Sequence, residues 1–174
     1  IMFNMSVGYT LDGIKGARMD AFIEGMRSPA GTAEWEEAVK EAKAAIGSPS
    51  FAAAFGKAGA ARAGEALKNI PLKPIHSVSL STMHGCPPEE IERIGAYLLE
   101  EKGFDTYVKL NPTLLGYDRV RDILDRTGWE RIIVTRPTFE NDLQFNAALE
   151  LIASLRKKAA AGGRSFGIKL SNTL

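Results

Sequence analysis

The junction between residues 79 and 94 contains side chains of the kinds that transfer protons. Thr82, His84 and Cys86 occupy alternate positions in its sequence, SLSTMHGCPPEEIERI, where an apolar segment gives way to glycine and proline. Cys86 is the only cysteine of the chain and His84 is one of two histidines. Histidine and an ionised thiol act as general acids or bases near neutral pH, whereas a threonine hydroxyl needs an activating neighbour. These three residues are the candidates for acid–base catalysis.

Two of the three also have a purely structural interpretation. Cys86 precedes Pro87 at an expected helix start, where the helix dipole would lower the pKa of the thiol and favour the thiolate. A free cysteine is nevertheless often a small packed residue, and we favour that interpretation for Cys86. His84 could orient a carbonyl group of a ligand, or it could hydrogen-bond the backbone of its own turn. The sequence leaves both roles of His84 open.

The elements that position these residues alternate between strands and helices. The segments expected to form strands are 2–8, 76–81, 106–111, 131–135 and 166–171. Helical patterns follow at about 87–103, 117–126 and 139–161. This alternation predicts βαβ units and a parallel sheet. The region 11–72 is rich in alanine and glycine and is longer than one crossover needs, so we expect a helical insertion between the first two strands.

Apolar and polar side chains alternate within the expected strands. In the second strand Val78 and Leu80 share one face, while Ser77, Ser79 and Ser81 share the other. Strands of an open parallel sheet are normally apolar on both faces. One polar face instead favours a barrel with helices outside and a ligand-lined interior. A closed (β/α)₈ barrel takes about 250 residues, so the chain predicts a partial α/β barrel of about five parallel strands.

Lys109 lies on the polar face of the strand 106–111, near the carboxyl end where ligands of such folds bind. A buried ammonium group is unfavourable without an anionic or electron-rich partner, which favours a ligand-binding role. One alternative is an aldolase-type Schiff-base nucleophile. Another is a structural carboxylate partner such as Asp142. Glu140, Asn141 and Asp142 are themselves expected to begin and cap a helix, and Asn141 is the lesser candidate for a site residue.

Five motifs resemble a family of flavoproteins: NMSVGY, STMHGCPPEEIERI, VKLNPTLLGYD, FENDLQ and GIKLSNT. The strand ends resemble the FMN-binding barrel of the dihydroorotate and dihydropyrimidine dehydrogenases. The whole set is most similar to the large flavoprotein subunits named "putative selenate reductase", which carry such a barrel beside iron–sulfur and FAD/NAD(P) modules. The resemblance spans nearly the whole chain. It implies that residues 1–174 are part of one such barrel in a flavin-dependent oxidoreductase.

The resemblance also implies which residues meet the cofactor. Lys109 matches a lysine that contacts FMN at the end of its strand. Asn172 and Thr173 match an Asn-Thr pair on the flavin and substrate side of the pocket. The phosphate-binding loops of these barrels follow the last two strands. We therefore expect an FMN site that is incomplete in this chain, and a chain that is inactive on its own.

Substrate-side positions of the resembling family fall on Ser79, Asn111 and Thr113, and the position of its catalytic cysteine falls on Thr82. Ser79 replaces an asparagine and Thr82 replaces that cysteine, so both departures argue against pyrimidine chemistry. They also support an alternative function, in which a degenerate, non-catalytic barrel scaffolds electron-transfer modules. The expected partners are the rest of the parent polypeptide, electron-transfer modules or subunits, and a small planar substrate.

Composition argues against several other classes of protein. The chain is 45% hydrophobic and 25% charged, with a net charge of +1, which is typical of a globular protein and gives no reason to expect nucleic acid or an anionic membrane as a partner. No apolar segment approaches the roughly 20 residues that span a bilayer. One cysteine excludes an internal disulfide and suits the cytoplasm. It also cannot ligate an iron–sulfur cluster, so such clusters and FAD or NAD(P) are expected only elsewhere in the parent protein, and no metal is expected here.

Overall fold

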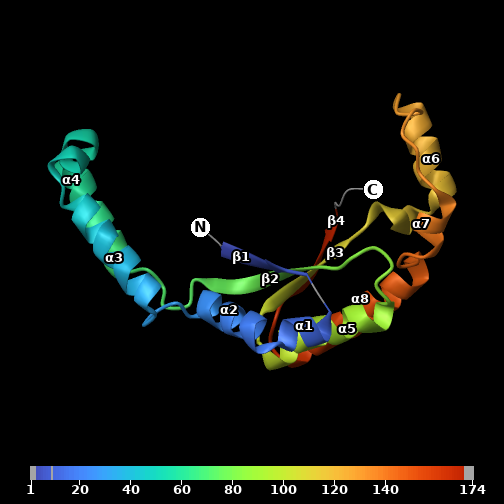
Figure 1. Cartoon of the computed structure of the whole chain (residues 1–174), viewed down its shortest axis with the longest axis horizontal. Coiled ribbons are helices and arrows are strands. Elements are labelled where there is room, and N and C mark those ends of the chain that lie inside the picture. The colour runs from blue at the N-terminus through green and yellow to red at the C-terminus, as the bar shows by residue number, and fades with distance from the viewer. Residues whose placement is uncertain (1–2, 9, 171–174) are drawn as a thin grey trace. The chain divides into compact units, whose positions relative to one another are not determined.

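The computed structural model of the protein describes residues 3–8 and 10–170. Its elements divide into two compact units (Figure 1). The helical unit comprises Asp20–Ile75, and the sheet unit comprises Asn4–Met19 together with the chain from His76 onward. The sheet unit contains every described residue that the sequence analysis selects as a site candidate.

The helical unit consists of most of α2 (Ala17–Arg27), α3 (Ala33–Ile46) and α4 (Pro49–Lys68). Thr32 and Ser48 begin α3 and α4, because their hydroxyl oxygens accept hydrogen bonds from the first free backbone N–H groups. The two helices lie side by side as a hairpin (Figure 1). Neither helix contains a buried residue. The alanine-rich part of the chain is therefore helical, as its sequence indicates.

The described part of the sheet contains four strands in the order β1-β2-β3-β4, namely β1 (Phe3–Val7), β2 (Ile75–Ser81), β3 (Asp105–Leu110) and β4 (Phe166–Leu170). β2 pairs with β3, and β3 with β4, in parallel. The crossovers between them contain helices, as a βαβ arrangement requires. Among the described residues β1 and β4 do not pair with each other, so this part of the chain forms part of a barrel, as the sequence predicts.

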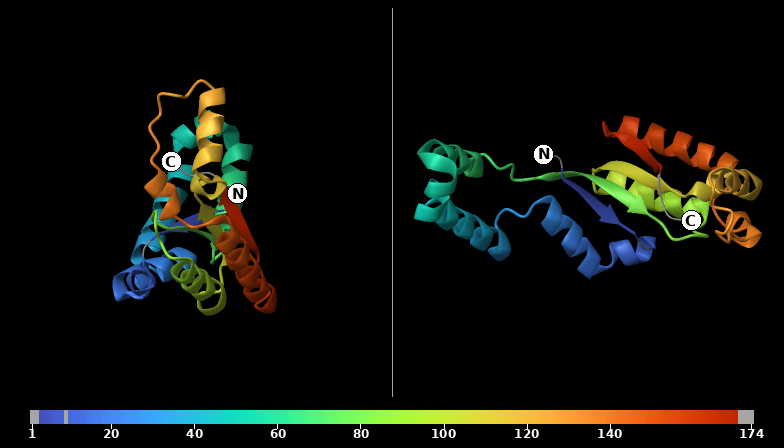
Figure 2. Two further views of the ribbon diagram at one scale, coloured as in Figure 1. Left: turned by 90° about the vertical axis from the view of Figure 1, so that its right-hand side faces the viewer. Right: turned by 90° about the horizontal axis from the view of Figure 1, so that it is seen from above.

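The remaining helices belong to the sheet unit: α1 (Leu11–Lys15), α5 (Pro88–Ala96), α6 (Tyr117–Arg126), α7 (Arg136–Glu140) and α8 (Phe145–Ala161). A π-helical turn, η1 (Tyr97–Glu101), extends α5, and a 3₁₀ turn, η2 (Pro112–Leu115), precedes α6. Helices α5 and α8 lie side by side along one face of the sheet (Figure 2). Gly95 lets them approach closely, because a Cβ there would lie 2.8 Å from Leu155 Cδ1.

The predicted division into an apolar and a polar face is confirmed in β1, β2 and β3 but not in β4, where Ile168 is 41% and Leu170 70% exposed. Val78 and Leu80 are fully buried, together with their neighbours on β3. On the other face Ser77 and Ser79 are buried as well, because Asn4 bridges them. Its Nδ2 donates to Ser79 Oγ at 2.8 Å, and its Oδ1 accepts from Ser77 Oγ at 2.9 Å. Hydrogen bonds between neighbouring strands thus satisfy the polar face of the sheet where it is buried.

The predicted strand at residues 131–135 is wrong, because these residues form an irregular connection between α6 and α7. Their apolar side chains find no sheet to cover, and Ile133 is 90% exposed. Arg121 on α6 binds the local backbone instead, donating to the carbonyl oxygens of Trp129 and Ile132. Carbonyl groups held by a guanidinium are not available for a ladder of strand hydrogen bonds. The described part of the sheet therefore has four strands.

The predicted helix at 139–161 is interrupted. α7 ends at Glu140, Asn141 forms its C-cap, and α8 begins only at Phe145. The residue that precedes α8 as its N-cap is Gln144. The expectation that residues 140–142 cap a helix start is therefore wrong, and Asp142 lies in the bend between the two helices. No helix in the described part of the chain is long and apolar enough to cross a membrane.

Candidate functional site

Asp142 joins the connections that follow β2 and β3 to the bend between α7 and α8. Its carboxylate lies 3.0 Å from His84 Nδ1 and accepts hydrogen bonds from Asn111 Nδ2 at 2.9 Å, Thr113 Oγ1 at 2.7 Å, and the backbone N–H groups of Gly85 at 3.2 Å and Leu143 at 3.0 Å. Three segments that are far apart in the sequence therefore converge on one side chain. We call Asp142 and these five partners the Asp142 cluster.

The Asp142 carboxylate is ionised although it is buried. Its side chain is only 3% exposed. Burial by itself would raise the pKa, but hydrogen bonds from Thr113, Asn111 and the backbone N–H groups of Leu143 and Gly85 outweigh that effect. Together they lower the pKa of Asp142 from 3.8 to about 2. The cluster is thus organised around a negative charge. Among the described residues no group of acidic, histidine and cysteine side chains is placed to hold a metal ion.

His84 lies at the edge of the Asp142 cluster. Its Nδ1 faces Asp142, while its side chain remains 43% exposed. Gly85 makes this arrangement possible, because its φ of 76° lies in the left-handed region that a residue with a Cβ rarely adopts. The turn can then direct both the imidazole of His84 and the backbone N–H of Gly85 at the same carboxylate. The His84 ring is fixed on one side and open on the other.

An open pocket of about 530 Å³ lies on the exposed side of this turn. The residues that line it are Thr10, Met83, His84, Gly85, Cys86, Pro87, Glu89, Glu90 and Arg93. Glu90 is held at one edge by the backbone N–H of Leu11 at 2.8 Å and by Arg93. The pocket therefore combines one imidazole, one thiol and several charged groups of α5.

The environment of Cys86 does not favour a thiolate. Burial raises the pKa of the thiol above its ordinary value of 9.0, and the carboxylates of Glu90 and Asp142 raise it further. The expectation that the helix start lowers this pKa is therefore wrong. The reason is that the thiol is partly buried and has two negative charges nearby, and α5 itself begins only at Pro88. The structural interpretation of Cys86 gains support from this environment.

Thr82 and Ser79, which fall at family site positions, have different surroundings. Thr82 is half-buried, and its hydroxyl makes no hydrogen bond to any residue that the structure describes. The activating neighbour that a catalytic threonine needs is thus not found in that part of the chain. Ser79 is buried and its hydroxyl is engaged with Asn4 on β1. Its observed role is to connect two strands.

The substrate candidates Asn111 and Thr113 both belong to the Asp142 cluster. Thr113 is buried in η2, and its hydroxyl donates to Asp142. Asn111 precedes η2 and directs its amide at the same carboxylate. The structure therefore brings the acid–base candidate His84 together with the substrate-side candidates Asn111 and Thr113. It adds Asp142, which the sequence analysis considered only as a helix cap or as a partner of Lys109.

Lys109 lies on the polar face of β3, at the carboxyl end, as its position in the sequence predicts. It is half-buried and makes no ion pair or hydrogen bond with the described residues. Its neighbours in register are Ser81 on β2 and Lys169 on β4. Asp142, the structural partner considered above, is occupied by the other members of its cluster.

An aromatic ring lies beside this pair of lysines. Tyr107 and Gly167 are partners in register two positions earlier on the same strands. A Cβ at Gly167 would lie 2.7 Å from Tyr107 Cδ1, so the ring occupies the space that a larger residue would fill. Lys109, Lys169 and Tyr107 therefore share one face of the sheet at its carboxyl end. Asn172 and Thr173, the other two candidates for cofactor binding, lie outside the described residues.

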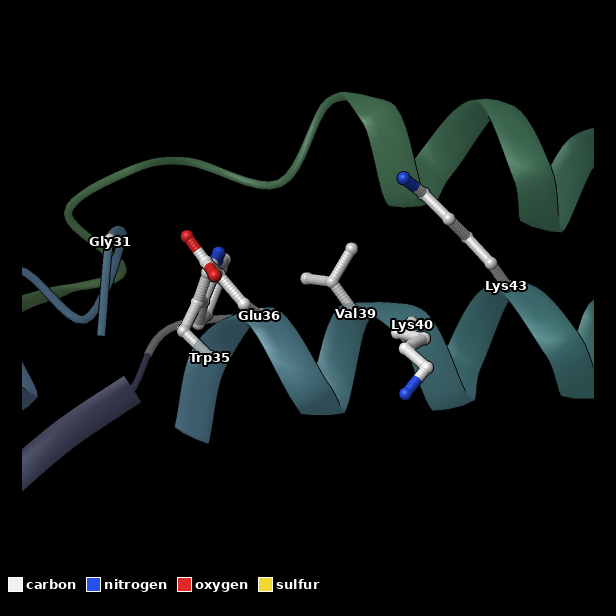
Figure 3. A pocket seen from close by; sticks show the side chains of 6 residues that line it. All are labelled: Gly31, Trp35, Glu36, Val39, Lys40 and Lys43. Carbon is white, nitrogen blue, oxygen red and sulfur yellow. The ribbon is translucent and has the colours of Figure 1, made fainter. Parts of the chain in front are cut away.

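The helical unit has a pocket of its own, lined by Gly31, Trp35, Glu36, Val39, Lys40 and Lys43. Figure 3 shows Val39 and Lys43 projecting from α3 toward α4. None of the residues selected from the sequence as site candidates lines it. The candidate site is therefore assigned to the sheet unit.

A parallel sheet with polar groups collected at the carboxyl ends of its strands is the arrangement of an α/β-barrel enzyme. The chain belongs to the family described as "Oxidoreductase YgfK, N-terminal TIM-barrel domain", whose model matches residues 1–174. This match confirms the barrel fold and the assignment to an oxidoreductase family.

Two curated relatives have the same printed name, "Putative oxidoreductase YgfK". One is from Escherichia coli strain K12 and the other from Escherichia coli O157:H7. Each is 44% identical to this chain over 174 residues, which is 99% of the chain but 17% of the relative. The chain thus spans about a sixth of the length of the relatives that it matches. No solved structure matches it.

Proposed function

We propose that this chain is the FMN- and substrate-binding barrel segment of a flavin-dependent oxidoreductase. The observation that carries the proposal is the pair Lys109 and Lys169, in register on neighbouring strands at the carboxyl end of the sheet. The class of enzyme follows from the family. The identity of the cofactor is our inference from these residues and from the resemblance of the strand ends to FMN-binding barrels.

Two lysines in register repel each other, because paired positions on neighbouring strands place like charges close together. Lys109 is also partly withdrawn from water, and the described part of the chain supplies it with no carboxylate. An anionic or electron-rich ligand would relieve both effects. The face that these lysines share with Tyr107 would suit a flat ligand with a delocalised negative charge.

A reduced flavin has this character, so the residues that are present fit the group. Bound FMN would supply the electron-transfer chemistry that amino-acid side chains lack. Lys109 would contact it, Lys169 would add positive charge, and Asn172 and Thr173 are the further contacts that the resemblance implies. A positive charge beside the cofactor stabilises its reduced form and so raises its reduction potential.

The proposal extends to the longer protein in which this segment lies. The relatives have about six times the length of this chain, so most of their sequence lies outside the matched segment. We propose that the iron–sulfur and FAD or NAD(P) modules implied by the resemblance lie in that remainder. The substrate that we propose for the barrel is a small planar molecule.

The test is the Lys109→Met substitution in the parent protein, with FMN content per folded molecule measured after the flavins are released and FMN is separated from FAD by chromatography. Methionine keeps most of the side-chain volume and removes the charge. We expect FMN affinity to fall by about tenfold or more, since one lost charge-assisted contact is worth roughly 1.5–3 kcal/mol. Lys157→Met on the exposed surface of α8 is the matched control and should leave flavin content unchanged.

Two outcomes would contradict the proposal. A parent protein that contains no FMN would favour the alternative function, a barrel that scaffolds electron-transfer modules without binding a flavin itself. Flavin content that is unaffected by Lys109→Met, in a variant that is less stable than the wild type, would show that Lys109 is a structural residue.

A further inference from the structure

We propose that His84 is the proton-transfer residue of this site and that Asp142 is the positioning residue that fixes its tautomer. In this arrangement His84 carries a proton on Nδ1, and its unprotonated Nε2 faces the pocket. The catalytic part of the inference rests on the proposed function, whereas the tautomer does not. Neither the family description nor the resemblance assigns a role to Asp142.

The protonation of Nδ1 follows from its partner. Nδ1 lies 3.0 Å from Asp142 Oδ2, and an ionised carboxylate can only accept hydrogen bonds. An unprotonated Nδ1 would direct its lone pair at that negative charge. Asn111 Nδ2 lies 3.3 Å from Nδ1 and 2.9 Å from the same carboxylate oxygen. The amide of Asn111 lies close to the imidazole ring because Asn111 Nδ2 and His84 Nδ1 both donate to the same oxygen, Asp142 Oδ2.

Nε2 is then the nitrogen left without a proton in the neutral ring. It lies on the side of the imidazole away from Nδ1, and the structure gives it no hydrogen bond to a described residue. His84 is partly exposed and lines the pocket. The ionisable groups that surround it are Asp142 behind the ring, Cys86 on the same turn, and Glu89, Glu90 and Arg93 on α5.

The chemistry available to Nε2 is the transfer of one proton. When a ligand gives up a proton, a new N–H bond forms at Nε2, the bond to hydrogen in the ligand breaks, and its electron pair stays on the ligand. The resulting imidazolium is stabilised by the carboxylate of Asp142. The reverse transfer returns the proton. A ligand for this site therefore has an acidic or basic group that can reach Nε2 from the pocket.

The other two catalytic candidates are less suited to this role. Thr82 has no activating partner in the described part of the chain, and its hydroxyl is a weak acid at neutral pH. The thiol of Cys86 stays protonated because its pKa is raised. Of the three residues only His84 has a partner that orients it and an atom that can accept a proton.

The Asp142→Asn substitution should reverse the tautomer. Asp142 Oδ1 accepts the backbone N–H groups of Gly85 and Leu143, so the carbonyl oxygen of an asparagine would be held at that position. Its NH₂ group would then replace Oδ2 and would point at His84 Nδ1. A donor at this position requires Nδ1 to accept, so the proton of the neutral ring moves to Nε2.

The experiment is a measurement of the imidazole ¹⁵N chemical shifts of the protein, labelled at its two histidines and assigned with His76→Gln. We expect a protonated Nδ1 in the wild type and a protonated Nε2 in Asp142→Asn. A wild-type His84 with its proton on Nε2 would overturn the inference. This result does not depend on Asp142→Asn, so a failure of that variant to fold would not protect the proposal.

Diethyl pyrocarbonate provides a second probe, because it acylates the unprotonated imidazole nitrogen. We expect His84 to react in the wild type and to react about tenfold or more slowly in Asp142→Asn, where the unprotonated nitrogen would face residue 142. His76 is the internal control. Equal rates at His84 in both proteins would contradict the assignment.

The flavin content of the parent protein separates this inference from the proposed function. A protonated Nδ1 in a protein that contains no flavin would refute the flavin assignment and leave the His84 tautomer intact. A protonated Nε2 in a protein that does contain FMN would refute only the role of Asp142.

Discussion

Asp142→Asn should destabilise the sheet unit at neutral pH, and most of that effect should disappear on acidification. The substitution keeps the size of the side chain and removes its charge. Asp142 is buried and holds three segments of the chain through hydrogen bonds. Its contribution to stability therefore depends on its ionisation, which the pH controls.

The magnitude follows from the pKa of the carboxyl group. The ordinary value is 3.8, and in the folded protein it is lowered to about 2. Each pKa unit corresponds to about 1.36 kcal/mol, so ionised Asp142 contributes about 2 kcal/mol to the free energy of unfolding. In Asp142→Asn the NH₂ group cannot accept the hydrogen bonds that the replaced oxygen accepted. This mismatch with the neighbouring donors would lower the free energy of unfolding by roughly 1 kcal/mol more. We therefore expect a destabilisation of about 3 kcal/mol at pH 7.

The direction of the pH dependence follows from the sign of the shift. A carboxyl group whose pKa is lowered on folding binds fewer protons in the folded state than in the unfolded state. Its stabilising effect is fully present above the ordinary pKa of 3.8 and is lost as the pH falls toward about 2. The difference between wild type and variant should be constant above about pH 5 and should shrink by about 2 kcal/mol by pH 2.

The assay is urea unfolding at several pH values, followed by the fluorescence of Trp129 in a Trp35→Phe background. Trp129 lies in the sheet unit and Trp35 in the helical unit, so only the relevant unit is observed. A His84→Gln background removes any effect of imidazole protonation. Asp122→Asn is the matched control, because its carboxylate is half exposed and lies 3.6 Å from Arg126. Such surface pairs contribute at most about 1 kcal/mol.

The reasoning would be refuted by a stability difference that stays the same from pH 7 to pH 2. That result would mean that Asp142 has an ordinary pKa in the folded protein. The hydrogen bonds that converge on it would then not favour the charged form.

Two further predictions concern other residues of the sheet unit. Cys86→Ser should change the turnover rate of the parent protein by less than about threefold, because the raised pKa of the thiol makes it a poor proton donor and a poor source of thiolate at neutral pH; a loss of 10²–10⁴-fold, typical of removing a general acid or base, would identify Cys86 as catalytic. Gly95→Val should lower the stability of the sheet unit by about 1–3 kcal/mol in urea unfolding, because even a Cβ would lie 2.8 Å from Leu155 Cδ1. Leu155→Ala should partly rescue Gly95→Val, and an equal loss in both backgrounds would show that this contact is not the cause.

The sequence alone determined the architecture of the sheet unit. Alternation with a period of two identified β2, β3 and β4, and it predicted which side of β2 holds Val78 and Leu80. The helix α6 was predicted with its observed bounds, Tyr117–Arg126. These features depend on residues that are close together in the chain, because a strand or helix buries its own apolar side chains against one neighbouring layer. Local periodicity is sufficient to predict them.

Local periodicity was not sufficient at residues 131–135 and 139–161. The segment RIIVT has the composition of a strand, yet Arg121 binds the backbone carbonyl group of Ile132 within it, and no strand in the described part of the chain pairs with it. The pattern of 139–161 continues across the break at 141–144, so it does not show that the helix stops. In both regions a contact with another element decided the outcome, and tertiary packing regularly overrides local preference.

The tertiary structure alone assigned Asp142 its place in the site. Its partners His84, Asn111 and Thr113 precede it by 58, 31 and 29 positions, and no local pattern connects them. The motif FENDLQ presents three polar residues in succession, of which Asn141 and Asp142 are both of a type that caps helices. Asp142 is identified as the buried and ionised residue of the three only when the segments that follow β2 and β3 are seen to meet it in the folded chain. A carboxylate can remain charged in the interior when enough donors surround it, and those donors come together only when the chain folds.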